Sequence, residues 1–111
     1  MEHAMDTAVE VFEISKSLPK KEDYALTSQI LRAAESISSN ISEGFGRGGD
    51  KEKIMFYRFS RGSADETKNH LIYGTLVKYF EEQQSSAIIS KIEDLVHELY
   101  KIIKTIENKG K

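Results

Sequence analysis

The sequence predicts an all-α protein, an antiparallel up-down-up-down four-helix bundle. Apolar residues recur at three- and four-residue steps through most of the chain, which is the period of a helix that buries one face. The composition agrees, because there is a single proline and 31% of the residues are charged. A chain of 111 residues is long enough for one domain, so we expect residues 1–111 to form a single bundle.

The first two helices are expected over residues 3–18 and 24–45, separated by Pro19, whose ring and missing N–H cannot continue a helix. Two faces of the first helix follow the helical period. Its apolar stripe includes Met5, Ala8, Val9, Phe12 and the segment from Ile14 to Leu18, and its acidic face holds Glu2, Asp6, Glu10 and Glu13. An acidic face is ordinarily solvated, and the alternative is a docking strip for a basic neighbour.

The third helix is expected over residues 50–80, after a glycine-rich stretch at residues 44–49. This stretch lacks the Lys-Ser/Thr ending of a phosphate-binding loop, so we interpret it as a turn whose glycines tolerate positive φ. Asp50 is placed to cap the helix. Gly62 and Gly74 lie inside it, where each costs roughly 1 kcal/mol relative to alanine, so we expect a close helix contact at both.

The fourth helix, expected over residues 85–107, has the most regular apolar pattern in the chain. Six residues alternate three and four apart, as in a coiled-coil seam, and three more form a row beside them. The seam is Ile89, Ile92, Val96, Leu99, Ile103 and Ile106, and the row is Ile88, Leu95 and Ile102. This surface is wider than one partner helix requires, so either the bundle core takes all of it or part faces another subunit.

The composition excludes several classes of protein. There is no cysteine, so disulfides, zinc–thiolate sites and cysteine nucleophiles are excluded. The net charge of −2 gives no global attraction to nucleic acid or to anionic lipid. No apolar run approaches the roughly 18 residues that a membrane span requires, and the N-terminus has no export-signal pattern. We therefore expect a cytoplasmic protein with no membrane partner.

The sequence contains no recognisable catalytic or metal-binding motif. Of the three histidines, His70 shares a helix face with Glu66 and His97 with Asp94, which we interpret as surface salt-bridge partners. A di-iron bundle needs Glu-x-x-His pairs, and the chain has none. It also lacks the Gly-x-Ser-x-Gly turn of serine hydrolases. We expect no enzyme activity, no metal and no cofactor.

Residues 47–61 form the one candidate surface for nucleic acid. Five basic residues are mixed there with two acidic ones and with the aromatic residues Phe56, Tyr57 and Phe59. Basic side chains can pair with phosphates while aromatic rings stack on bases. The candidate phosphate contacts are Arg47, Lys51, Arg58 and Arg61. The alternative is that the aromatic residues lie in the core and the basic residues at its rim or in an intersubunit contact.

Four polar residues lie close to the apolar stripe of the second helix: Gln29, Arg32, Asn40 and Glu43. Buried polar groups need hydrogen-bond partners, so we expect these side chains to bond one another or a neighbouring chain. They are predicted to be a structural or intersubunit polar set.

The segment from Leu26 to Arg47 resembles the central motif of the four-helix bundle proteins encoded in intervening sequences of bacterial 23S rRNA genes. The residues that match this motif are Gln29, Arg32, Ala33, Ser36, Ile37, Ser39, Asn40, Ile41, Glu43, Gly44, Gly46 and Arg47. Phe56, Arg58, Gly62, Ser63 and Glu66 match the family's following helix. The chain departs from the family where Leu31 replaces an arginine, Ser38 a proline and Lys53 an aromatic residue.

The resemblance implies a four-helix bundle that assembles as a ring-like homopentamer, in a family whose members mostly have no established activity. A related branch, the accessory variability determinant of diversity-generating retroelements, is a basic pentamer that binds nucleic acid and reverse transcriptase. We therefore expect a non-enzymatic, homopentameric binding or scaffold protein, with the acidic face of the first helix near basic residues of another subunit. The alternative is an accessory protein that binds RNA or DNA.

Overall fold

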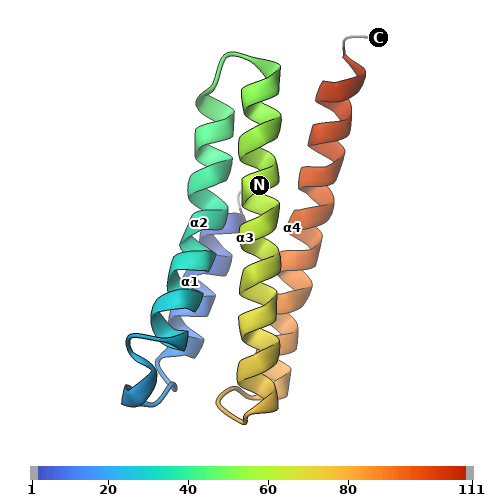
Figure 1. The fold of residues 1–111 in the computed structure, drawn as a ribbon. Coiled ribbons are helices and arrows are strands. Elements are labelled where there is room, and N and C mark those ends of the chain that lie inside the picture. The colour runs from blue at the N-terminus through green and yellow to red at the C-terminus, as the bar shows by residue number, and fades with distance from the viewer. Residues whose placement is uncertain (1–2, 110–111) are drawn as a thin grey trace.

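The computed structural model describes residues 3–109 as an antiparallel bundle (Figure 1). Its elements are α1 (His3–Ser15), the short 3-10 helix η1 (Lys20–Glu22), α2 (Leu26–Gly46), α3 (Asp50–Leu76) and α4 (Glu82–Asn108). Each long helix reverses the direction of the one before it, so α1 and α3 point the same way. Since α1 and α3 each pack on both α2 and α4, the predicted four-helix bundle is confirmed.

The helices differ in length, and this leaves part of the bundle uncovered. Helix α1 has 13 residues, whereas α2 has 21 and α3 and α4 have 27 each. Figure 1 shows α1 beside only the lower part of the bundle, away from the connection between α2 and α3. Within residues 3–109, the upper part of the bundle is therefore built from α2, α3 and α4 alone.

The core is apolar on three helices and largely small or polar on α3. Large aliphatic side chains from α1, α2 and α4 have no exposed surface, including Val11, Ile30, Ile37, Ile92 and Leu99. Helix α3 adds Leu71, but its other fully buried positions are Ser60, Ala64 and Thr67. Small side chains let α2 and α3 approach closely, and these two helices share the most extensive contact in the bundle.

The apolar pattern of α4 is largely enclosed by this one chain. Its buried residues are Ile88, Ile92, Leu95, Leu99 and Ile103, and Ile89, Val96, Ile102 and Ile106 pack half-buried against the core. Of the two alternatives left open by the sequence, the bundle core therefore takes most of the surface, and the half-buried residues keep part of it exposed.

The face of α1 that enters the core differs from the predicted stripe. The residues that point inward are Ala4, Thr7, Val11 and Ile14, whereas Met5, Val9 and Phe12 are exposed. Small alanine and threonine side chains pack against α2 and α4, so the larger residues one position further along lie outside. The prediction of a buried stripe through Met5, Val9 and Phe12 is therefore wrong.

The predicted helix ends are accurate to within four residues. Helix α1 ends at Ser15 rather than at residue 18, and Pro19 follows after a short turn. Helix α3 ends at Leu76 rather than at residue 80, because Lys78 adopts a left-handed conformation with φ 71°. This turn packs the Phe80 ring directly on Gly74, so a Cβ at Gly74 would lie 2.4 Å from the ring.

Residues 47–49 form the predicted turn between α2 and α3, but by a different geometry. None of the described glycines has positive φ, so the explanation by left-handed glycines is wrong. The N-cap of α3 is Gly49, and Asp50 is its first helical residue, with no capping hydrogen bond from a side chain. Lys53 closes the turn instead, because its ammonium group donates to the Phe45 carbonyl at 3.0 Å.

Candidate functional site

A small polar network joins α2 to α3. The Asn40 side-chain amide donates to the Ser36 hydroxyl at 3.0 Å, and the Ser63 hydroxyl of α3 donates to the same oxygen at 3.0 Å. One turn along, the buried Ser60 hydroxyl donates to the Ile37 carbonyl at 2.8 Å. Such satisfied polar contacts fix the relative positions of the two helices.

The polar set predicted on α2 is divided among three environments. Asn40 is half-buried in the network just described. The Glu43 carboxylate accepts a hydrogen bond from Arg47 at 2.9 Å, one turn further along the same helix. Gln29 and Arg32 share this flank by helical spacing, and both are exposed. The structure therefore uses half of the set within the chain and leaves the other half on the surface.

The four basic candidates do not share one surface. Arg47 pairs with Glu43 and lies over the Phe56 ring, 4.8 Å from its centre, on the side of α3 that faces α2. Arg58 lies on the opposite flank, where it pairs with Glu107 of α4 at 3.0 Å. Both guanidinium groups therefore have carboxylate partners within the chain, which weakens their attraction for phosphate.

Lys51 and Arg61 make no hydrogen bond or ion pair among residues 3–109. Lys51 is exposed at the edge of a hollow of about 300 Å³ between α3 and α4, which Met55 and Phe59 also line. Glu107 closes the same hollow. The region is therefore basic and aromatic, as predicted, but acidic side chains interrupt it.

Large apolar side chains are exposed in groups on two helices, while α2 and α4 expose only Phe45 and Tyr100 among the described residues. On α1 these are Met5, Val9 and Phe12, and on α3 they are Met55, Phe59, Ile72, Tyr73 and Leu76. Sequence reasoning did not find these surfaces, because helical periodicity identifies a stripe without saying whether it faces inward. A usable signal was present in α3, where alanine, serine and threonine occupy the inner positions and the large residues fall outside.

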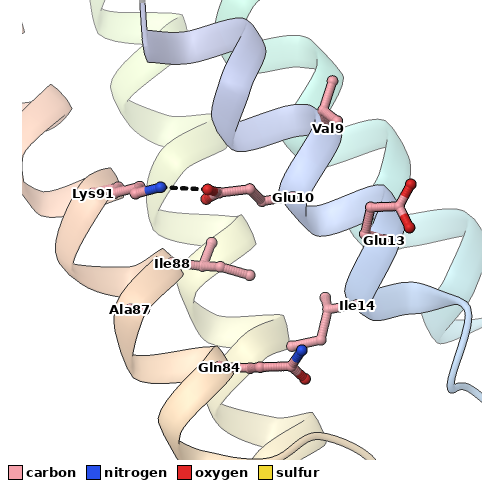
Figure 2. Close-up of a pocket in the computed structure, with 8 residues that line it drawn as sticks. All are labelled: Val9, Glu10, Glu13, Ile14, Gln84, Ala87, Ile88 and Lys91. Atoms are coloured by element: carbon pink, nitrogen blue, oxygen red, sulfur yellow. Dashed lines mark hydrogen bonds and ion pairs between the residues drawn. The ribbon is translucent and has the colours of Figure 1, made fainter.

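Figure 2 shows how α1 meets α4 along a groove of about 280 Å³. Ile14 and Ile88 point into this groove, and an ion pair between Glu10 and Lys91 bridges it. Val9 and Glu13 point away from α4. On the predicted acidic face, Glu10 thus pairs with Lys91 of α4, Glu13 is exposed and pairs with Lys16, and Asp6 is exposed. Glu2 lies outside the described residues.

A second hollow, of about 530 Å³, lies where α1 begins beside the upper part of α2. Ser38 and Ile41 of α2 line it, together with Met5 of α1 and Tyr57 of α3. Burial raises the pKa of the Tyr57 phenol. The hollow opens to solvent beside Phe45, whose side chain is 78% exposed. It is the direct consequence of the short first helix.

Neither of the two predicted histidine pairs belongs to a cluster that could hold a metal within the part of the chain that the structure describes. The predicted pair of Glu66 and His70 is present, with 3.5 Å between carboxylate oxygen and Nε2. His97 is exposed on α4. Across residues 3–109, no helix has both the length and the apolar character needed to cross a membrane.

The whole bundle matches a known family. Residues 1–105 match the family described as the 23S rRNA-intervening sequence protein. The chain belongs to that family. A crystal structure of a protein of unknown function from the S23 ribosomal protein family of Bacteroides thetaiotaomicron VPI-5482 has the same fold, with a TM-score of 0.86. The two chains are 24% identical over 93% of this chain and 96% of the other.

Membership of the 23S rRNA-intervening sequence family confirms the resemblance seen in the segment from Leu26 to Arg47. The related crystal structure shows the fold alone, and its protein is described as having unknown function. No curated protein matches the chain. Family and fold therefore place the bundle without indicating an enzymatic reaction.

Proposed function

We propose that this member of the 23S rRNA-intervening sequence family is a non-enzymatic binding or scaffold protein that works as a homo-oligomer, and that the oligomer is a pentamer. One observation carries the proposal. The chain buries or half-buries every apolar residue of the α4 seam, yet it leaves Met5, Val9 and Phe12 exposed along one face of α1 and Met55 and Phe59 along α3. Contiguous exposed apolar surface marks an interaction site in a stable protein.

The distribution of these residues favours copies of the same chain as partners. Two separate helices each present an apolar strip, and a ring requires each subunit to offer two different surfaces. The pentameric number comes from the resemblance of the α2 motif, which also supplies the exposed Gln29 and Arg32 as intersubunit polar groups. Association through α1 would place the exposed carboxylates Asp6 and Glu13 beside basic residues of a neighbour.

Sedimentation velocity at micromolar concentration tests the proposal. We expect a single species with five times the chain mass, at low salt and at high salt, because apolar burial rather than surface charge holds it together. A chain that sediments as a monomer under both conditions removes the oligomer, and a stable species of another size removes the pentamer.

The alternative is an accessory protein that binds RNA or DNA through Arg47, Lys51, Arg58 and Arg61. The family's description links these proteins to 23S rRNA genes. Lys51 and Arg61 also have no carboxylate partner within residues 3–109, and in the sequence they stand on either side of Phe56 and Phe59, whose rings pack edge to face. Binding to a single-stranded RNA should weaken steeply as salt rises.

Charge reversal separates this alternative from non-specific attraction. We expect the double variant Lys51→Glu/Arg61→Glu to lose RNA binding at low salt. The matched control Lys20→Glu/Lys78→Glu changes the net charge equally at the far end of the bundle, and it should bind RNA almost as well as the unaltered chain. Absence of any retention on RNA or single-stranded DNA at low salt rules the alternative out, and equal losses in both variants rule out the 47–61 surface.

A further inference from the structure

Gly62 lies in the middle of α3 on its outer face, where nothing in the chain requires a glycine. A Cβ placed there would meet no atom within 4 Å. Its counterpart Gly74 is needed, because the Phe80 ring occupies the space of its missing side chain. A glycine inside a helix destabilises it by about 1 kcal/mol relative to alanine. The absence of a side chain at Gly62 therefore points to close approach by something outside the chain.

The residues around Gly62 shape a notch on the outer face of α3. Residues three and four apart are neighbours on a helix surface, so Phe59 lies on one side of Gly62 and Glu66 on the other. Met55 continues the same face one turn earlier. Phe59 is 52% exposed and Met55 42% exposed. The face Met55–Phe59–Gly62–Glu66 thus has an apolar end, a gap and an acidic end.

Helix α1 carries a surface with the same spacing. Met5, Val9, Phe12 and Lys16 follow one another by four, three and four residues, as do Met55, Phe59, Gly62 and Glu66. The three apolar members of the α1 set are more than half exposed, at 59%, 53% and 51%. The ammonium group of Lys16 lies 5.2 Å from the centre of the Phe12 ring. This surface therefore has an apolar end, a large ring and a basic end.

Laid in parallel, the two surfaces are complementary at each step. The large Phe12 ring falls on the gap at Gly62, Val9 falls beside Phe59, and Lys16 reaches Glu66. Lys16, the first residue after α1, pairs with Glu13, but that pair is about 60% exposed (61% and 59%) and contributes little, so Lys16 can turn to a new partner.

The flanking charges select the parallel orientation. Each residue of a helix is turned by about 100° from the one before it. Going around each helix in this direction, Asp6 and Glu13 lie just after the apolar strip of α1, whereas Arg58 and Arg61 lie just before the strip of α3. In parallel helices that face each other, these two flanks lie on the same side, so the exposed ion pairs Glu13–Lys16 and Arg58–Glu107 can be exchanged for contacts between Glu13 and the guanidinium groups. In antiparallel helices the two flanks would lie on opposite sides. Because α1 and α3 run the same way in the bundle, copies related by rotation about an axis along the bundle present them in parallel (Figure 1).

We infer that the α1 strip of one copy packs on the Gly62 face of α3 in the next copy, with Phe12 filling the notch at Gly62. The inference rests on the proposed self-assembly and assigns its interface. Since the two surfaces differ, each contact is head-to-tail, and a rotation that closes produces a ring. The occupant of the notch is thus a second copy of this chain.

Disulfide trapping tests the contact directly, because the chain contains no cysteine. Lys16→Cys and Glu66→Cys lie at the rim and leave Phe12 and Gly62 unchanged. When the two single variants are mixed under mild oxidation, we expect one covalent dimer that contains both. The double variant should give a ladder of covalent multimers. Neither single variant should cross-link alone, and Lys16→Cys mixed with Ser90→Cys, which is also an exposed site but on α4, should not cross-link either.

A bulky substitution at Gly62 tests the same contact by measuring self-association without a cross-link. Gly62→Trp fills the notch, and we expect self-association to weaken by at least about tenfold, since a bulky group at the centre of a packed contact blocks it. The open space around Gly62 means that the bundle itself should keep its helical circular dichroism and cooperative melting. Ser90→Trp is the matched control and should associate normally.

The outcomes distinguish this inference from the proposed function. If the unaltered chain is oligomeric but Lys16→Cys and Glu66→Cys do not cross-link, or if either single variant cross-links with itself in preference, the interface is wrong and the oligomer stands. Normal association of Gly62→Trp overturns the interface in the same way. A monomeric unaltered chain removes both.

Discussion

Helices α3 and α4 have the same length, 27 residues, and opposite distributions of large apolar side chains. In α4 the isoleucines and leucines face inward, and none of them belongs to the exposed large residues. In α3 the inner face is mostly small or polar, and large residues such as Phe59 and Leu76 lie outside. The helix with the simpler pattern builds the core, and the helix with the less regular pattern presents a surface.

This difference follows from what each helix packs against. Ser60 and Ser63 on the inner side of α3 bond to α2 and let the two backbones come close, whereas α4 contacts α1 and α3 through branched aliphatic side chains. A helix that contributes small residues to the core needs no large apolar residue for its own stability. The large residues outside α3 are therefore the ones that the proposed self-assembly would bury.

The largest effect should come from truncating the inner face of α4. Leu99 has no exposed surface, so Leu99→Ala removes packed methyl groups and leaves a cavity, and we expect the free energy of unfolding to fall by about 2–5 kcal/mol. Phe59→Ala on α3 removes a larger side chain from a half-exposed site, and it should change the unfolding of the dissociated chain by less than about 1 kcal/mol. Urea unfolding monitored by circular dichroism at low concentration gives both values. Equal decreases in the free energy of unfolding for the two variants would show that Phe59 is as important to the core as Leu99.

The contrast between α3 and α4 also shows which features of the fold can be predicted from the sequence. The number of helices and their order followed from periodicity. Periodicity identified the apolar pattern of α4 but did not decide between the core and an intersubunit contact. The placement of Met5, Val9 and Phe12 did not follow, since α1 could turn either its aromatic strip or its alanine and threonine face inward. Packing against α2 and α4 decides this, and packing is a property of the whole fold.

The candidate site was predictable in composition and not in arrangement. The region around Arg47 and Arg58 is basic and aromatic, as the residues indicate. Its division between two flanks of α3, and the pairing of Arg58 with Glu107, depend on where α4 ends, some 50 residues away in the sequence. Local charge counts cannot include such a partner.

Substituting alanine for each of the two glycines inside α3 should change the free energy of unfolding by an intermediate amount, in opposite directions. Gly74→Ala drives a Cβ into the Phe80 ring, so we expect the free energy of unfolding to fall by about 1–3 kcal/mol. Gly62→Ala meets open space and should stabilise the dissociated chain by about 0.5–1 kcal/mol, because alanine is the better helix former. Thermal and urea unfolding at the lowest measurable concentration provide the comparison. Loss of stability in both variants would show that the outer face of α3 is already packed within one chain.

The smallest effect concerns the turn after α3, where the Tyr79 hydroxyl donates to Glu22 at 2.9 Å and ties this turn to η1. The hydrogen bond to Glu22 raises the pKa of the Tyr79 phenol above its ordinary value of 10.0, and burial adds to the rise. A raised pKa in the folded state means that the contact stabilises the fold fully below about pH 10 and is lost as the pH rises through the higher folded value.

Tyr79→Phe should therefore be less stable than the unaltered chain at neutral pH, and this difference should shrink as the pH rises past about 10. Tyr24→Phe is the control, because Tyr24 is fully exposed and its removal should leave the unfolding curve unchanged at every pH. Unfolding in urea across pH 7 to 11 measures both differences. A Tyr79→Phe difference that stays constant up to the highest pH would show that the phenol contributes by packing alone, and that the two connections at this end of the bundle are held together without the hydrogen bond to Glu22.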